Sequence, residues 1–237
     1  MSELGTTAGR RVWDAPVRII HWGLVLAVFG AWVSRELEGD WFRVHTWCGY
    51  TVLLLASTRV AWGFVGTRHA RFSAFVRGPG AIVAYLRGLL GRGGGAPSPA
   101  GHNPLGALMV LALLALLLAQ ALTGLFANDQ IMETGPLFGY VTAQLSDRLT
   151  TVHKQLFDVL TAAIAVHVLA ALVYLFVKRE NLILPMITGR KPGDLLPPGA
   201  SDIGSSRTLL AVGIAAALGA LLWWVVKNAP EASLFAF

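Results

Sequence analysis

The stretch HKQLFDVLTAAIAVHV, residues 153–168, decides how this chain folds. It begins with His153, becomes apolar after a few residues, and reaches His167 fourteen positions later. On an α-helix, fourteen residues return to within about 40° of the same face and advance about 21 Å. A single membrane-spanning helix would therefore present one imidazole near each surface of a hydrocarbon core about 30 Å thick.

The rest of the chain is equally suited to lipid. Of its 237 residues, 55% are hydrophobic and only 14% are charged, and the mean hydropathy of +0.61 is too high for a soluble domain. Runs of roughly 20 apolar residues predict five spans: residues 17–34, 44–65, 105–127, 152–177 and 208–226. We expect an all-α membrane protein with a four-helix transmembrane bundle and a fifth, C-terminal transmembrane helix.

The predicted organisation divides the chain near residue 190. Residues 1–190 would form the four-helix domain, including a loop over 66–103, and residues 191–237 a linker and the fifth helix. Asn103 is a suitable N-cap for the third span, with Pro104 at its first helical position. Residues 80–90 suggest a short interfacial helix, and residues 91–101 and 192–205 are Gly/Pro-rich linkers.

Basic residues set the expected orientation. The segment 68–103 holds five arginines and no acid, whereas the predicted loops before residue 44 and before residue 152 contain most of the nearby acids. Loops rich in Lys and Arg stay on the cytoplasmic side. We therefore expect a bacterial inner-membrane protein with a cytoplasmic N-terminus and a periplasmic C-terminus. This bias also explains the net charge of +6 without nucleic-acid binding.

Two further histidines complete two levels in the membrane. His45 begins the second span on the outer side, level with His153, and His21 lies in the inner half of the first span, level with His167. Zinc or copper would need three or four ligands at one level. Two imidazoles per level instead predict two stacked b-type haems, although a histidine in a span can also serve only in an interhelical hydrogen bond.

Other residues refine this prediction. The chain has one cysteine, Cys48, which excludes a C-x-x-C-H haem attachment site, so any haem would be non-covalent. Gly49 lies one turn after His45 and would admit a flat macrocycle, or would pack helices. Arg59, on the His45 face at inner depth, would pair with a haem propionate or extend to the interface. Asp158 lies off the haem face, for a proton route or a helix contact.

Five motifs carry a resemblance to a known family: VWDAPVRIIHW (12–22), VHTWCGY (44–50), GTRHARFSAFVRGP (66–79), GHNP (101–104) and HKQLFDVLTAAIAVHV (153–168). Over about residues 12–190 the chain resembles the bacterial cytochrome b561 and hydrogenase-type cytochrome b membrane proteins. The resemblance implies two b-type haems that carry electrons between the quinone pool and a redox partner such as a hydrogenase, a dehydrogenase or a c-type cytochrome. His21, His45, His153 and His167 match the ligand positions of that family.

The sequence leaves open the roles of two loop histidines and the activity of the protein. His69 and His102 would line a quinone pocket, bond a propionate or cap the loop; His102 lies nearer the expected inner haem edge. An electron-carrier subunit of an oxidoreductase is favoured over an independent enzyme. The alternatives are a stand-alone quinone-linked oxidoreductase acting on a small species such as superoxide, and a multi-span transporter or assembly factor without haem.

Overall fold

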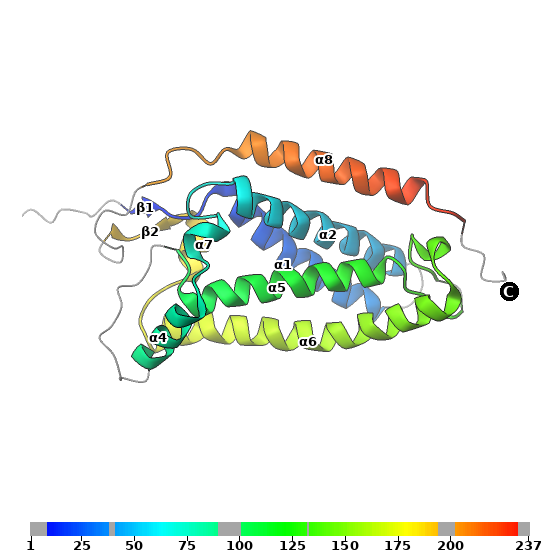
Figure 1. The fold of residues 1–237 in the computed structure, drawn as a ribbon, viewed down its shortest axis with the longest axis horizontal. Coiled ribbons are helices and arrows are strands. Elements are labelled where there is room, and N and C mark those ends of the chain that lie inside the picture. Colours follow the sequence, from blue (N-terminus) through cyan, green and yellow to red (C-terminus); the bar gives the residue numbers. More distant parts are fainter. Residues whose placement is uncertain (1–8, 38–40, 90–100, 132, 194–201, 232–237) are drawn as a thin grey trace, which may run out of the picture. The chain divides into compact units, whose positions relative to one another are not determined.

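The computed structural model describes residues 9–37, 41–89, 101–131, 133–193 and 202–231. Its elements in chain order are β1 (Arg10–Arg11), α1 (Ala15–Arg35), α2 (Trp41–Val65), α3 (Phe72–Phe75), α4 (Pro79–Leu89), α5 (Pro104–Gly124), the 3₁₀ helix η1 (Phe138–Tyr140), α6 (Ala143–Phe176), α7 (Ile183–Thr188), β2 (Arg190–Lys191) and α8 (Thr208–Lys227) (Figure 1).

Five helices are long and apolar enough to cross a membrane: α1, α2, α5, α6 and α8. They confirm the five predicted spans and the all-helical membrane fold. In the most apolar windows of α6 and α8 only 6% of the residues are buried inside the protein. Exposed apolar surface of this extent requires lipid rather than water around it.

Two features of the fold were not predicted. Helix α6 begins at Ala143, well before the predicted residue 152. The prediction began too late because the first turns carry Asp147 and Arg148, and a search for apolar runs finds only the part embedded in lipid. Strands β1 and β2 form a small antiparallel sheet in which Arg10 pairs with Lys191. Strands of two residues are too short to show the alternation that identifies a strand.

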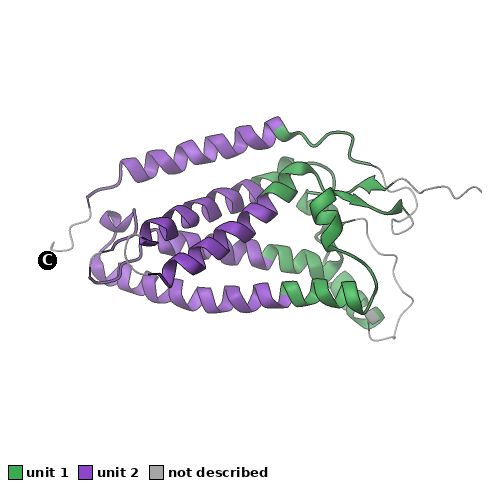
Figure 2. Cartoon of the chain, turned by 180° about the vertical axis from the view of Figure 1, so that it is seen from behind, with its two compact units in different colours: residues 1–19, 61–111, 167–208 green, residues 20–60, 112–166, 209–237 purple. Residues whose placement is uncertain are grey.

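The chain divides into two compact units, each built from three separate segments (Figure 2). Unit 1 comprises Met1–Ile19, Ala61–Leu111 and His167–Thr208, and unit 2 comprises Ile20–Val60, Ala112–Val166 and Leu209–Phe237. Each long helix of the four-helix core contributes a part to both units. The predicted domain division near residue 190 stays a prediction, and the predicted linkers at 91–101 and 192–205 fall mainly outside the described residues.

Glycines allow close helix packing in unit 2. A Cβ added to Gly23 of α1 would lie 2.7 Å from Leu55 of α2, and one added to Gly30 would lie 2.9 Å from Cys48. Both distances are shorter than a methyl group tolerates, so the two helices approach along this small-residue face. The approach matters because α2 carries His45.

In unit 1, the side chain of Asp14 holds the ends of two helices together. Its carboxylate is 1% exposed. Oδ1 accepts a hydrogen bond from the Val17 amide at 2.8 Å and so caps α1. Oδ2 accepts from Trp62 Nε1 at 3.0 Å and from the Thr67 hydroxyl at 2.5 Å. One buried carboxylate thus ties the start of α1 to the end of α2 and the segment that follows it.

Candidate haem-binding site

The predicted outer ligands lie close together in unit 2. His45 belongs to α2 and His153 to α6, and their ring centres are 6.3 Å apart with the ring planes at 79°. An imidazole nitrogen binds a first-row metal at about 2 Å, so two rings on opposite sides of one ion have centres about 6 Å apart. The observed separation therefore suits two axial ligands of one iron.

Both imidazoles are oriented by main-chain carbonyls. His45 Nδ1 lies 2.8 Å from the carbonyl oxygen of Ala31, and His153 Nδ1 lies 2.9 Å from that of Gln120. A carbonyl oxygen only accepts, so each Nδ1 must carry the proton. Nε2 is then the unprotonated nitrogen of each ring, as is typical of metal-binding histidines.

The other ring nitrogen of His153, Nε2, carries no proton. Its Nε2 lies 3.2 Å from the side-chain amide nitrogen of Gln120. That amide nitrogen donates, so Nε2 accepts and carries a lone pair. His153 is therefore held as a neutral imidazole whose donor atom is the one a haem iron needs.

A buried polar cluster holds the start of α6 against the end of α5. The Asn128 side-chain amide donates to the Ser146 hydroxyl at 2.5 Å, and that hydroxyl donates to the Phe126 carbonyl at 2.6 Å. The Asn128 backbone amide donates to Thr150 Oγ1 at 2.9 Å. Ser146 is 0% exposed. The cluster fixes the register of α6 within two turns of His153.

Two glycines shape the space around these rings. A Cβ added to Gly124 of α5 would lie 2.9 Å from His153 Cε1, so only glycine admits the ring at this distance. A Cβ added to Gly49 of α2 would meet no atom within 4 Å. Gly49 thus borders open space one turn after His45, where the sequence predicted room for a flat macrocycle. The Nε2 atoms of His45 and His153 and the open space beside Gly49 both fit a haem.

The predicted inner pair is divided between the units. His21 lies in α1 within unit 2, where its ring meets Trp22 edge-on at 5.1 Å. His167 lies in α6 within unit 1. Their pairing stays a prediction.

Arg59 lies in α2 and is only 6% exposed. An arginine that extends its guanidinium to the interface would be more exposed, so its burial disfavours snorkelling. Its contact with a haem propionate stays a prediction. Asp158 is exposed on α6, and this exposure does not distinguish a proton route from a helix contact.

His102 belongs to an aromatic cluster in unit 1. Its ring lies 4.7 Å from that of Trp13 and 4.8 Å from that of Phe75. The adjacent Asn103 caps α5, since its Oδ1 accepts from the Gly106 amide at 2.7 Å, and Pro104 is the first helical residue. The predicted cap is confirmed, whereas the role of His102 at a haem edge stays a prediction.

Sequence reasoning missed the partners of the outer histidines. Ala31 acts through its backbone carbonyl, and Gln120 acts through both its backbone carbonyl and its side-chain amide. A backbone contact gives no side-chain pattern that the sequence could reveal. Asn128 and Ser146 gave no signal either, because they are 18 residues apart in the sequence and meet only in the folded chain. Among the described residues, no group of three or more His, Cys, Asp or Glu side chains is placed to hold a bare metal ion.

Comparison with known proteins gives one match. Residues 12–189 match the family described as prokaryotic cytochrome b561. Searches of curated proteins and of solved structures found no match. The match covers more than half of the chain, including all four histidines of the predicted haem ligand set. The chain therefore belongs to the prokaryotic cytochrome b561 family, whose members carry electrons in the membrane through b-type haem.

Proposed function

We propose that the chain carries electrons across the inner membrane through two non-covalent b-type haems, one held by His45 and His153 and the other by His21 and His167. The observation that carries the proposal is the outer pair: two rings 6.3 Å apart, each with its Nδ1 proton directed to a backbone carbonyl. Haem, when bound, supplies one-electron iron chemistry.

The chain's own groups hold and adjust each site. A carbonyl that accepts a hydrogen bond from Nδ1–H fixes the ring plane and makes Nε2 a stronger electron-pair donor to a metal. The Asn128 and Ser146 cluster keeps α6 in register, so His153 does not shift along its helix. His153 and His167 lie on one helix about 21 Å apart along its axis, so the two proposed haems would lie at different depths.

The proposed electron route joins the quinone pool to a redox partner protein. The partner would be a hydrogenase, a dehydrogenase or a c-type cytochrome. Arg59 is only 6% exposed, and this burial favours a propionate contact at the inner haem over an extension of the side chain to the interface.

The test is the haem content of the purified full-length protein and of single variants. The wild type should contain two haems per chain. His45→Ala and His153→Ala should each remove the same haem, and His21→Ala and His167→Ala should each remove the other. A redox titration with optical spectra identifies which haem remains. His69→Ala, which alters a histidine outside the proposed ligand set, is the matched control and should retain both haems.

Two results would contradict the pairing: loss of different haems from His45→Ala and His153→Ala, or loss of neither from one of them. A colourless wild-type preparation that binds no haem would instead favour the transporter or assembly alternative. Quinone reduction by superoxide without any partner protein would favour the stand-alone oxidoreductase.

A further inference from the structure

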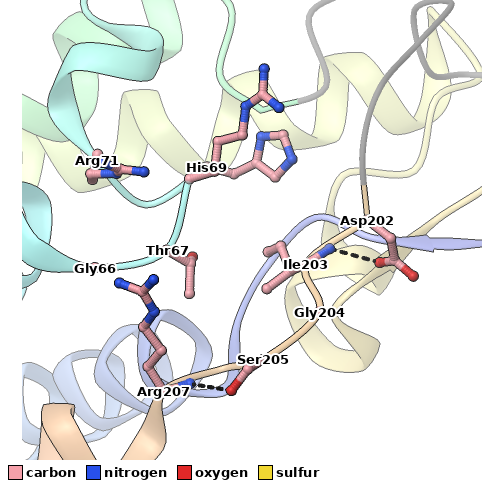
Figure 3. A pocket seen from close by; sticks show the side chains of 10 residues that line it. Gly66, Thr67, His69, Arg71, Asp202, Ile203, Gly204, Ser205 and Arg207 are labelled. Carbon is pink, nitrogen blue, oxygen red and sulfur yellow. Dashed lines mark hydrogen bonds between the residues drawn. The ribbon is translucent and has the colours of Figure 1, made fainter.

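Unit 1 contains a basic pocket that the haem proposal does not use. It is open to the outside, has a volume of about 240 Å³, and is lined by residues from two segments, 66–71 and 202–207 (Figure 3). The first segment directly follows α2 and the second directly precedes α8. Both helices are apolar enough to span the membrane, so the pocket lies where the chain leaves the hydrocarbon.

Positive charge dominates the lining. The pocket has three arginines, Arg68, Arg71 and Arg207, together with His69, against one acid, Asp202. The Asp202 Oδ1 atom accepts hydrogen bonds from the backbone amides of Arg11 at 2.7 Å and Ile203 at 2.9 Å. The three guanidinium groups of the lining therefore face the charge of a single carboxylate, which leaves positive charge in excess.

Two of the arginines have no carboxylate partner among the described residues. The ion pairs found there join Arg35 to Glu36 and Lys191 to Glu180, and neither includes Arg71 or Arg207. In Figure 3 the Arg207 guanidinium points across the pocket toward Gly66 and Thr67. Arg71 belongs to the first lining segment and Arg207 to the second, so both segments contribute a guanidinium to the lining.

The two segments are fixed to a common support. Thr67 is 5% exposed and donates its hydroxyl proton to buried Asp14. Ile203 is 8% exposed, and its amide lies 3.3 Å from the Arg11 carbonyl. Both walls of the pocket are therefore attached to residues 11–14, and the arginines project from anchored backbone rather than from free loops.

The backbone at Arg207 is unusual. Its φ is 48°, in the left-handed region that residues other than glycine rarely adopt. The Arg207 amide donates to Ser205 Oγ at 3.3 Å within this turn. Strained backbone of this kind is concentrated at ligand sites, and here it directs the Arg207 side chain into the pocket.

We infer that this pocket binds the phosphate group of an anionic membrane phospholipid. Guanidinium groups match phosphate oxygens in pairs, and basic pockets next to transmembrane helices bind anionic lipid head groups. Free phosphate has the same oxyanion chemistry. The lipid is favoured because the pocket directly adjoins two spans, so a head group can enter while its acyl chains stay beside α2 and α8.

The experiment measures lipid binding to the purified full-length protein by native mass spectrometry. The probes are dioleoyl phosphatidylglycerol, dioleoyl phosphatidylcholine and inorganic phosphate. The wild type should bind phosphatidylglycerol at least tenfold more tightly than phosphatidylcholine. Arg71→Gln and Arg207→Gln should each reduce this preference severalfold, and Arg207→Lys should lie between Arg207→Gln and the wild type.

Arg87→Gln is the matched control. Arg87 is an exposed arginine of α4 outside the pocket, so this variant removes the same charge and should keep the lipid preference. Circular dichroism checks that every variant is helical; if Arg207→Gln fails to fold, Arg71→Gln and Arg207→Lys still decide. An equal loss in Arg87→Gln, or displacement of phosphatidylglycerol by millimolar inorganic phosphate without any lipid preference, would overturn the inference.

Discussion

At the scale of single residues, the two outer histidines differ from histidines that only pack. A packing histidine is satisfied by any hydrogen bond, whereas His45 and His153 both direct Nδ1 to a backbone carbonyl of another helix. The same nitrogen is used in both rings, so each ring keeps Nε2 as its unprotonated nitrogen. This shared orientation favours a common ligand over two unrelated helix contacts.

Arg59 is the residue through which we expect the chain to adjust the inner haem. Arginine stays protonated at every accessible pH, and Arg59 is buried in α2. Arg59→Gln removes the positive charge that we propose lies beside the inner haem, and its loss should favour the oxidised, more positive haem. The inner midpoint potential should fall by an amount on the order of tens of millivolts, while the outer potential should change much less. A redox titration that resolves both haems measures this, and equal shifts in the two would argue against the contact.

Asp14 is the residue on which unit 1 depends for stability. Asp14→Asn replaces one acceptor oxygen with an amide group that faces the Val17, Trp62 or Thr67 donors. A buried donor left without an acceptor costs about 1–3 kcal/mol, so we expect a lower apparent melting temperature in detergent, followed by circular dichroism. Asp158→Asn alters an exposed carboxylate and should leave the melting temperature unchanged. Equal melting of both variants would show that the Asp14 contacts contribute little.

Among the secondary-structure elements, the long helices could be predicted from the sequence, whereas the contacts between them could not. Apolar runs locate spans because lipid selects composition directly, and Asn103 and Pro104 marked the start of α5 through local capping chemistry. The first turns of α6 were not predicted because they are polar. The ligand level shared by His45 and His153 followed from helix rise, but their carbonyl partners did not, since backbone groups of other helices carry no sequence signal.

The end of α7 is a joint that only glycine can make. Gly189 has a φ of 81°, and its carbonyl accepts from the amides of Val12 at 2.9 Å and Trp13 at 3.1 Å. A Cβ at Gly189 would lie 2.7 Å from the Trp13 carbonyl oxygen. Gly189→Ala should therefore lower the melting temperature, because the left-handed backbone alone costs about 1–2 kcal/mol and the backbone oxygen cannot move aside easily.

The matched control for that change is Gly78→Ala, in the segment between α3 and α4. A Cβ there meets no atom within 4 Å, and its φ is not in the left-handed range. We expect Gly78→Ala to melt with the wild type. If the two alanine variants lower the melting temperature equally, the Gly189 turn is not the cause of the loss.

At the scale of the whole molecule, both units are assembled from segments that are distant in sequence. Unit 1 collects the segments that flank the spans on the arginine-rich side, including residues 66–71 and 202–207, and unit 2 contains the outer histidines. The proposed transfer of electrons across the membrane needs one haem toward each compartment. The orientation of the chain therefore decides which side each proposed haem serves.

Reporter fusions test that orientation. A reporter inserted within residues 93–100, which lie outside the described residues, should read cytoplasmic, because the arginines of short loops dominate orientation. Fusions after Phe237 and within residues 36–40 should both read periplasmic. The second of these controls for translocation of the reporter itself, since it follows a different span. A periplasmic signal from residues 93–100 together with cytoplasmic signals from the other two would invert the protein in the membrane: His45 and His153 would then lie toward the cytoplasm, with the ligand pairs unchanged.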